Sequence, residues 1–279
     1  ESRGLGDVYK RQTVLSRPAQ ASKLSMGTAV LWLSVIVLLP LAALTTQAFG
    51  EGWSGFRDAV TATGSLDALR VTIVVSAVVG VISAVTGTLV AWVLVRDDFP
   101  GKKVVDALID LPFALPTIVA SLVLLSLYGP DSPLHITLNA TRPALVIALA
   151  FVCLPFVVRA VQPVLMELDG DVEEAAASLG ANNATIFRRI ILPALVPAIL
   201  SGTGLAFARA LGEFGSVVLI GGNIPGETQV ASQYIQEQIE SDVPHAAAAV
   251  SVVLLAVTFL VLLGLRFAGE AKSRKEQRI

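Results

Sequence analysis

The sequence contains one cysteine and two histidines, so few of its side chains suit metal binding or redox chemistry. Cys153 has no second cysteine with which to form a disulfide within the chain. With two distant histidines, it also cannot assemble a tetrahedral metal site of the usual kind. We therefore expect the chain to bind no metal ion.

Charged residues are also scarce, making up 15% of the 279 residues against about 25% in a soluble domain. The formal net charge of -2 leaves no excess of basic side chains to neutralise phosphates, which excludes nucleic acid as an expected partner. Hydrophobic residues, counted without the 22 glycines, make up 54%. This composition is typical of a membrane protein and not of an ordinary soluble enzyme.

Three sequence patterns that would indicate catalysis are absent. The chain has no Gly-x-x-x-x-Gly-Lys-Ser/Thr loop for nucleotide phosphates, and no His-Glu-x-x-His or Gly-x-Ser-x-Gly pattern of a hydrolase. We therefore expect no catalytic residue and no cofactor bound by this chain. Energy from ATP would have to come from another polypeptide.

Six stretches are nearly free of charge and long enough for helices that cross a membrane, which need about 20 largely apolar residues. Arg209 and Glu213 interrupt the fifth stretch, and the fourth extends past Arg159 to Met166. The stretches are residues 24–50, 71–95, 111–130, 143–158, 190–226 and 243–265. We predict an all-α integral membrane protein with six transmembrane helices, because the connections are too short for a soluble domain.

The distribution of Lys and Arg predicts the orientation of these helices. If the N-terminus is cytoplasmic, sixteen of the twenty basic residues lie in cytoplasmic segments, and only Arg57, Arg70 and Arg142 lie in outer loops. Cytoplasmic loops of membrane proteins are enriched in basic residues. We therefore expect both termini to be cytoplasmic.

The two ends of the chain are predicted to lie outside the membrane domain. Residues 1–23 form a cytoplasmic tail, in which Glu1–Gln12 resembles a non-native leader, and residues 269–279 form a basic tail. The first apolar stretch is longer than the about 7 to 15 residues of a signal-peptide core. The first helix is therefore expected to stay in the mature protein.

The cytoplasmic loop of residues 165–193 is longer than the others and predicts two short helices. Asp171–Leu179 carries acidic residues in its first turn, where the helix dipole favours them, and Gly180 is placed to end it. Asn182 or Asn183 can cap a second helix that leads into the membrane. By composition alone, the loop also fits an amphipathic connector on the membrane surface.

The same loop matches a known pattern at seven defined positions. It resembles the EAA motif of ABC importer permeases, in which this loop is the coupling helix that docks on the ATP-hydrolysing subunit. Small alanines let a short helix approach another protein closely, and glycine permits a sharp turn. The matching residues are Glu174, Ala175, Ala176, Gly180, Ile190, Leu192 and Pro193.

Three further segments resemble the sulfate and thiosulfate permeases within that family, in particular the CysT-type subunit. They begin at Asp106, Pro155 and Arg209, and read Asp-Ala-Leu-Ile-Asp-Leu-Pro-Phe-Ala-Leu-Pro-Thr, Pro-Phe-Val-Val-Arg, and Arg-Ala-Leu-Gly-Glu-Phe-Gly. Molybdate permeases share the Gly-Glu-Phe-Gly element. A molybdate or tungstate permease is therefore an alternative, and sulfate is not separated from thiosulfate.

The resemblance implies a fold and a set of partners. Residues 24–268 would form the transmembrane bundle of a type I ABC importer (MetI-like) in the inner membrane. The implied partners are two ATPase subunits that hold ATP and Mg²⁺, a second permease that is a CysW-type sister or a second copy, and an extracytoplasmic sulfate-binding protein. A secondary anion transporter or channel without an ATPase is an alternative of another class, but it gives no reason for the EAA spacing.

Two positions within the predicted helices carry charges that need explanation. Arg209 and Glu213 lie four residues apart, which would bring them together on one helix face. They form either a structural ion pair or, with Phe214, part of the anion path or its gate, since guanidinium groups suit tetrahedral oxyanions. Arg159 is expected to extend toward lipid headgroups. Gly80 and Gly87 are expected to allow close helix packing.

Overall fold

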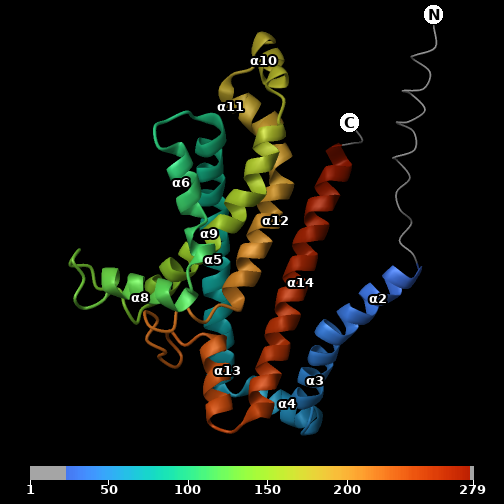
Figure 1. Cartoon of the computed structure of the whole chain (residues 1–279), viewed down its shortest axis with the longest axis vertical. Coiled ribbons are helices and arrows are strands. Elements are labelled where there is room, and N and C mark those ends of the chain that lie inside the picture. Colours follow the sequence, from blue (N-terminus) through green and yellow to red (C-terminus); the bar gives the residue numbers. More distant parts are fainter. Residues whose placement is uncertain (1–22, 277–279) are drawn as a thin grey trace, which may run out of the picture. The chain divides into compact units, whose positions relative to one another are not determined.

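The computed structural model describes residues 23–276, and within that range the chain forms helices and turns without any strand (Figure 1). The predicted all-α class is therefore confirmed for the described part. The leader predicted at Glu1–Gln12 lies outside the described residues, as do residues 277–279 of the predicted basic tail. The chain divides into two compact units, of which the first ends at Thr46 and the second begins at Gln47.

The first unit contains the first predicted transmembrane helix. It consists of α2 (Lys23–Leu33), the π-helical turn η1 (Ser34–Leu38) and most of α3 (Leu39–Ala48). The stretch Met26–Ala48 is long and apolar enough to span a bilayer. Large apolar side chains on several of its faces are exposed, as expected of a helix surrounded by lipid.

The second unit contains four further stretches that are long and apolar enough to span a bilayer. The long helices are α5 (Thr63–Arg96), α9 (Arg142–Glu167), α12 (Leu192–Leu211) and α14 (Pro244–Glu276). α12 continues without a break from α11 (Asn183–Ile186) and the π-helical turn η2 (Phe187–Ile191). The shorter helices are α4 (Gly52–Thr61), α6 (Lys102–Ile109), α7 (Leu111–Ala114), α8 (Thr117–Tyr128), α10 (Gly170–Ser178) and α13 (Ala231–Glu240).

The core of this unit lies where α5, α9 and α12 pack against one another (Figure 1). Glycines bring the three helices close together. A Cβ atom at Gly87 of α5 would lie 2.7 Å from the Cβ of Val157, and one at Gly202 of α12 would lie 2.8 Å from the Cα of Val157. Val157 of α9 is therefore held between glycines of two helices, and the predicted close packing at Gly87 is confirmed.

Replacing Gly202 with alanine is expected to destabilise the bundle by about 1–3 kcal/mol, the usual cost of overpacking a core. The added methyl group would press on the backbone of α9, which cannot move away as a flexible side chain could. Gly264→Ala in α14 is the matched control, because a Cβ there meets nothing within 4 Å. Thermal unfolding in detergent measures both variants, and equal midpoints would contradict the packing argument.

The third predicted span, residues 111–130, is wrong as a continuous helix. The structure breaks it into α7 and the 12-residue α8, with Leu115 and Pro116 extended between them. The physical reason is steric, since proline disfavours helical conformation in the residue before it. α8 is about 18 Å long at about 1.5 Å per residue, which is shorter than the bilayer core. Residues 23–276 thus contain five helices of spanning length instead of the predicted six.

The fifth predicted span, residues 190–226, ends earlier than its charge pattern suggested. α12 stops at Leu211, and residues 212–230 form turns without a regular helix. Ser121 of α8 supports this segment, because its buried Oγ accepts hydrogen bonds from the amides of Leu219 at 3.1 Å and Ile220 at 3.2 Å. A side chain of the short α8 therefore satisfies backbone donors that a continuous helix would have paired internally.

Candidate functional site

The loop of residues 165–193, called the coupling loop below, contains the helix α10 that the sequence predicted. Asp169 caps α10, since its Oδ1 accepts a hydrogen bond from the Asp171 amide at 3.0 Å. Asp171 and Glu173 lie in the first turn, where their charges face the positive end of the helix dipole. The predicted acidic start of this helix is confirmed.

A sharp turn at Gly180 follows α10, as predicted. Gly180 has a φ of +89°, in the left-handed region that favours glycine. The Gly180 amide donates to the Ala177 carbonyl at 2.9 Å, and the Ala181 amide donates to the Ala176 carbonyl at 3.0 Å. Asn182 then caps α11, because its Oδ1 accepts from the Thr185 amide at 2.9 Å. The capping residue of the second helix is therefore Asn182 and not Asn183.

The seven residues of the EAA-like pattern do not form one surface. Glu174 and Ala175 are exposed on α10, whereas Ala176 is partly buried and packs against the core. The later residues of the pattern lie in η2 and at the start of α12, where all are partly buried; they are Ile190, Leu192 and Pro193. The first residues of the pattern are thus exposed to solvent, and the last ones join the loop to α12.

Two contacts with the end of α5 hold the coupling loop on the bundle, and the sequence did not reveal them. Arg96 Nη2 forms an ion pair with Glu173 Oε1 of α10. The Arg96 guanidinium also lies 5.5 Å from the ring centroid of Trp92, and that ring meets Phe187 of η2 edge-on at 5.7 Å. Cation–π and edge-to-face contacts of this kind each stabilise an arrangement modestly. Together they fix both helical parts of the loop to one helix end.

The predicted contact between Arg209 and Glu213 is present. Arg209 Nη2 lies 2.6 Å from Glu213 Oε2, although α12 ends at Leu211 and Glu213 belongs to the following turn. The Glu213 side chain is 1% exposed, against 38% for Arg209. The other carboxylate oxygen of Glu213 accepts a hydrogen bond from the Ser216 amide at 2.9 Å. Glu213 therefore ties the end of α12 to the turn that contains Phe214.

That turn also packs on the broken helix α7–α8. Phe214 is partly buried beside Glu213, and a Cβ atom at Gly215 would clash with the Oγ1 of Thr117, the first residue of α8. Ser232 of α13 donates a hydrogen bond to the Glu213 carbonyl at 2.8 Å. The candidate path residues Arg209, Glu213 and Phe214 thus lie at a junction of α8, α12 and α13.

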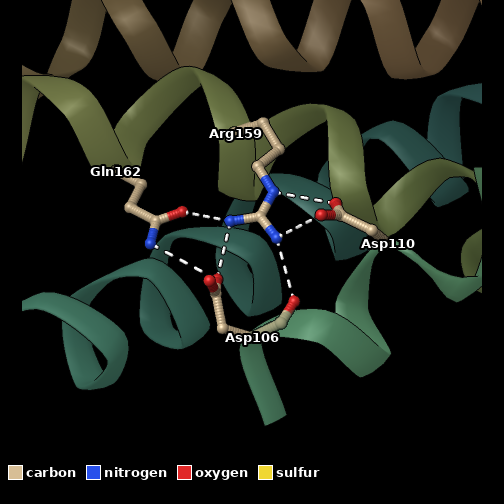
Figure 2. Close-up of polar contacts among 4 residues, drawn as sticks. All are labelled: Asp106, Asp110, Arg159 and Gln162. Carbon is tan, nitrogen blue, oxygen red and sulfur yellow. Dashed lines mark hydrogen bonds and ion pairs between the residues drawn. The ribbon is translucent and has the colours of Figure 1, made fainter. Parts of the chain in front are cut away.

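The prediction that Arg159 extends to lipid headgroups is wrong, because its guanidinium is bound by three other residues of the protein. Figure 2 shows its guanidinium between Asp106 and Asp110 from the α6–α7 segment, with Gln162 on its own helix α9. Arg159 Nε and Nη2 donate to the two carboxylate oxygens of Asp110 at 2.8 and 2.6 Å. This is the bidentate geometry in which arginine binds carboxylates most strongly.

The remaining donors of Arg159 are also satisfied. Nη1 donates to Asp106 Oδ1 at 2.7 Å and to Gln162 Oε1 at 2.6 Å, and Nη2 donates to the Asp106 carbonyl at 2.9 Å. All five N–H groups of the guanidinium are therefore used. The group is partly exposed, at 30% for Arg159, 41% for Asp106 and 48% for Asp110. We call Arg159, Gln162, Asp106 and Asp110 the Arg159 cluster. It joins α9 to α6 and to the connection between α6 and α7.

The comparison with protein families matches residues 76–270 to the family of binding-protein-dependent transport system inner membrane components. Among individual proteins, the sulfate transport system permease protein CysT of Salmonella typhimurium is 43% identical over 246 residues, which cover 86% of this chain and 89% of that protein. CysT of Synechocystis is also 43% identical, over 88% of both chains.

Two solved structures share the fold. The crystal structure of a bacterial ABC transporter involved in the import of the acidic polysaccharide alginate has a TM-score of 0.74 and 17% identity, over 95% of this chain and 98% of that one. The same kind of transporter in complex with an alginate pentasaccharide-bound periplasmic protein has a TM-score of 0.72 and 17% identity, over 94% and 95% of the chains. At these identities the likeness concerns the fold.

Proposed function

Because the chain belongs to the family of binding-protein-dependent transport system inner membrane components, we propose that it is the CysT-type permease subunit of an ATP-driven sulfate importer. The identity of 43% to CysT permeases over most of the chain is the observation that carries this proposal. It supports sulfate over molybdate or tungstate, and an ABC permease over an ATPase-independent transporter. Thiosulfate has the same tetrahedral, doubly charged form and is proposed as a second substrate.

The partners follow from the same family. Two ATPase subunits would bind ATP and Mg²⁺, and one of them would dock on the exposed residues Glu174 and Ala175 of α10 in this chain. A second permease subunit would complete the path, and an extracytoplasmic sulfate-binding protein would deliver the anion. The related alginate transporter in complex with a periplasmic protein supports this general arrangement. The chain itself would perform no bond chemistry.

The contacts described above suggest how movement of α10 would reach the path. α10 follows α9 after only Leu168 and Asp169, and the Arg159 cluster joins α9 to the α6–α8 segment. Ser121 of α8 then holds the amides of the turn that follows α12. Docking and release of the ATPase would therefore shift α9, the broken helix and the turn around Glu213 together.

The proposed importer transports radiolabelled sulfate only with its partners. We expect uptake in cells that lack their own sulfate permeases, when the chain is expressed with its ATPase, second permease and binding protein. Uptake should stop when the phosphate-loop lysine of the ATPase is replaced, and unlabelled sulfate should compete better than molybdate. Uptake that persists without a working ATPase would indicate a secondary transporter instead.

The charge distribution leads us to propose that both termini and the coupling loop are cytoplasmic. Reporter fusions after Asp98 and within the coupling loop are expected to report the cytoplasm, and fusions near Ser132 and Gln233 to report the outside. Alkaline phosphatase and green fluorescent protein fusions measure the two sides independently. An outside signal from a fusion at Glu174 would rule out docking of an ATPase on α10.

Gly180→Val is expected to reduce sulfate uptake by about tenfold while the chain still inserts in the membrane. Valine does not adopt the φ of +89° without a cost of about 1–2 kcal/mol, so the turn after α10 would change shape. Co-purification of the ATPase and sulfate uptake measure the effect. Gly101→Val is the matched control, because Gly101 has a φ of +87° and open space around it in another connection. Equal uptake by both variants would make the coupling loop a passive connector.

A further inference from the structure

A cavity of about 420 Å³ opens between the first part of α5, the start of α9 and the loop at Gly226. This volume lies within the range of about 300–1,000 Å³ that is usual for small-molecule sites. With cytoplasmic termini, the cavity is on the outer side of the membrane. The candidate path residues Arg209, Glu213 and Phe214 do not line it.

The α5 side of the cavity consists of one helix face. Its residues are spaced by three and four positions, as neighbours on a helix surface are. They are Asp67, Arg70, Val71, Val74 and Val75. Arg142, the first residue of α9, adds a second guanidinium. The lining therefore contains two positive charges, from Arg70 and Arg142, and one negative charge, from Asp67. The rest of its α5 side consists of three valines.

Two of the three basic residues predicted on the outer side meet at this cavity. The third, Arg57, is paired with Asp58 at 3.1 Å. Between residues 23 and 276, neither Arg70 nor Arg142 forms an ion pair with a carboxylate. Arg142 is oriented by backbone carbonyls, since its Nε donates to Glu227 O at 3.0 Å and its Nη2 to Gly226 O at 3.4 Å. Three of its five N–H groups stay available.

We propose that this cavity binds a tetrahedral oxyanion between Arg70 and Arg142. Guanidinium groups donate paired hydrogen bonds to sulfate- and phosphate-type oxygens, and two of them outweigh the single Asp67. The valine wall also accepts an apolar tail, since Val74 is 53% exposed while Val71 and Val75 are buried. The oxyanion is therefore either free sulfate at the outer face or the phosphate of a phospholipid whose acyl chain lies along α5.

The single cysteine of the chain permits a local test that does not depend on transport. Cys153 is fully buried, so a Val74→Cys variant of the full-length chain has one reactive thiol, located in the cavity. The purified protein in phosphate-free detergent is treated with anionic sulfonatoethyl methanethiosulfonate. We expect sodium sulfate, but not sodium chloride at equal ionic strength, to slow labelling by about tenfold, the effect of about 1.4 kcal/mol of binding.

A second series separates the two sources of the oxyanion. Dioleoyl phosphatidylglycerol is added to delipidated protein in place of sulfate, with dioleoylglycerol as the phosphate-free control. Protection by sulfate assigns the cavity to a free anion, and protection by phosphatidylglycerol alone assigns it to a lipid phosphate. Absence of protection by both, or equal protection by dioleoylglycerol, would overturn the proposal.

Matched variants test the role of the two arginines. Protection of Val74→Cys should disappear when Arg70→Gln and Arg142→Gln are added, and protection that persists would overturn the proposal. Leu66→Cys is the control thiol, since Leu66 is 47% exposed on the same helix but does not line the cavity. Its labelling should not respond to sulfate, and an unchanged rate in the double arginine variant shows that the fold is intact. The labelling assay measures binding to the purified protein and not transport. Its result therefore stands even if the chain is shown not to take up sulfate.

Discussion

Glu213→Ala is expected to lower the yield of folded protein, with a loss of about 1–3 kcal/mol of stability, because a buried amide loses its acceptor while the unpaired Arg209 is partly exposed to solvent. The substitution removes the partner of Arg209 at 2.6 Å and leaves the Ser216 amide without its acceptor in a buried turn. A loss of that size is a large fraction of the about 5–15 kcal/mol by which most proteins are stable. The yield of folded chain in the membrane and its thermal midpoint in detergent measure the effect. Glu213→Gln, which keeps an acceptor for Ser216, should lose less.

The double variant Arg209→Met with Glu213→Leu separates a structural ion pair from an anion contact. Replacing both charges with apolar side chains avoids an unpaired charge, so we expect assembly and sulfate uptake to recover in large part. A double variant that assembles, keeps its ATPase coupling and still fails to move sulfate would falsify the structural interpretation. It would place Arg209 on the anion path.

Arg159→Gln is expected to reduce sulfate uptake by at least about tenfold, even where the chain still folds. The substitution removes the bidentate bond to Asp110 and leaves two carboxylates of the α6–α7 segment facing each other without a cation. Each charge-assisted hydrogen bond contributes about 1.5–3 kcal/mol when buried, and the partial exposure of this cluster lowers that figure. Uptake and the rate of transport-linked ATP hydrolysis are measured together.

Two controls make the Arg159 result specific. Arg159→Lys keeps the charge but loses the forked geometry, so its uptake should lie between those of the wild type and Arg159→Gln. Arg57→Gln removes an ion pair with 66% exposed side chains and should leave uptake unchanged. If Arg159→Gln transports sulfate normally while its thermal midpoint falls, the cluster contributes to stability alone and does not transmit movement.

The coupling loop shows what local sequence could predict. Its helix boundaries follow from short-range chemistry: acidic residues in the first turn, a glycine at a left-handed position, and an asparagine that caps the next helix. Each of these signals acts within about four residues, so one sequence was enough to read them. The same holds for the contact between Arg209 and Glu213, which are only four residues apart along the chain.

The third span shows where the composition misled. A window free of charge measures apolarity, and residues 111–130 are apolar in both the predicted and the observed structure. What breaks the helix is the conformational restriction that Pro116 places on Leu115, which a hydropathy count does not register.

Contacts between distant segments were the part that the sequence could not supply. Arg96 and Glu173 are 77 residues apart, and Arg159 and Asp106 are 53 apart. The predicted topology placed all four near the cytoplasmic side, but many charges share that side. The choice of partners depends on how α5, α6, α9 and α10 pack, which requires the three-dimensional arrangement.

Val157 of α9 is packed between Gly87 of α5 and Gly202 of α12, so on the proposed coupling α9 would turn about this point. Val157 lies 15 residues after Arg142 and 10 before Glu167, so about 22 Å of helix separates it from the start of α9 and about 15 Å from the end. A rod that turns about one point moves its ends in opposite directions, and the longer arm moves farther. On the proposed coupling, the pull of an ATPase on α10 would swing the outer end, where Arg142 holds Gly226 and Glu227, the opposite way. Gly202→Ala crowds that point, so its uptake should fall more than its stability alone accounts for. The two faces of the transporter would then be opposite ends of a single moving part, which cannot both open at once.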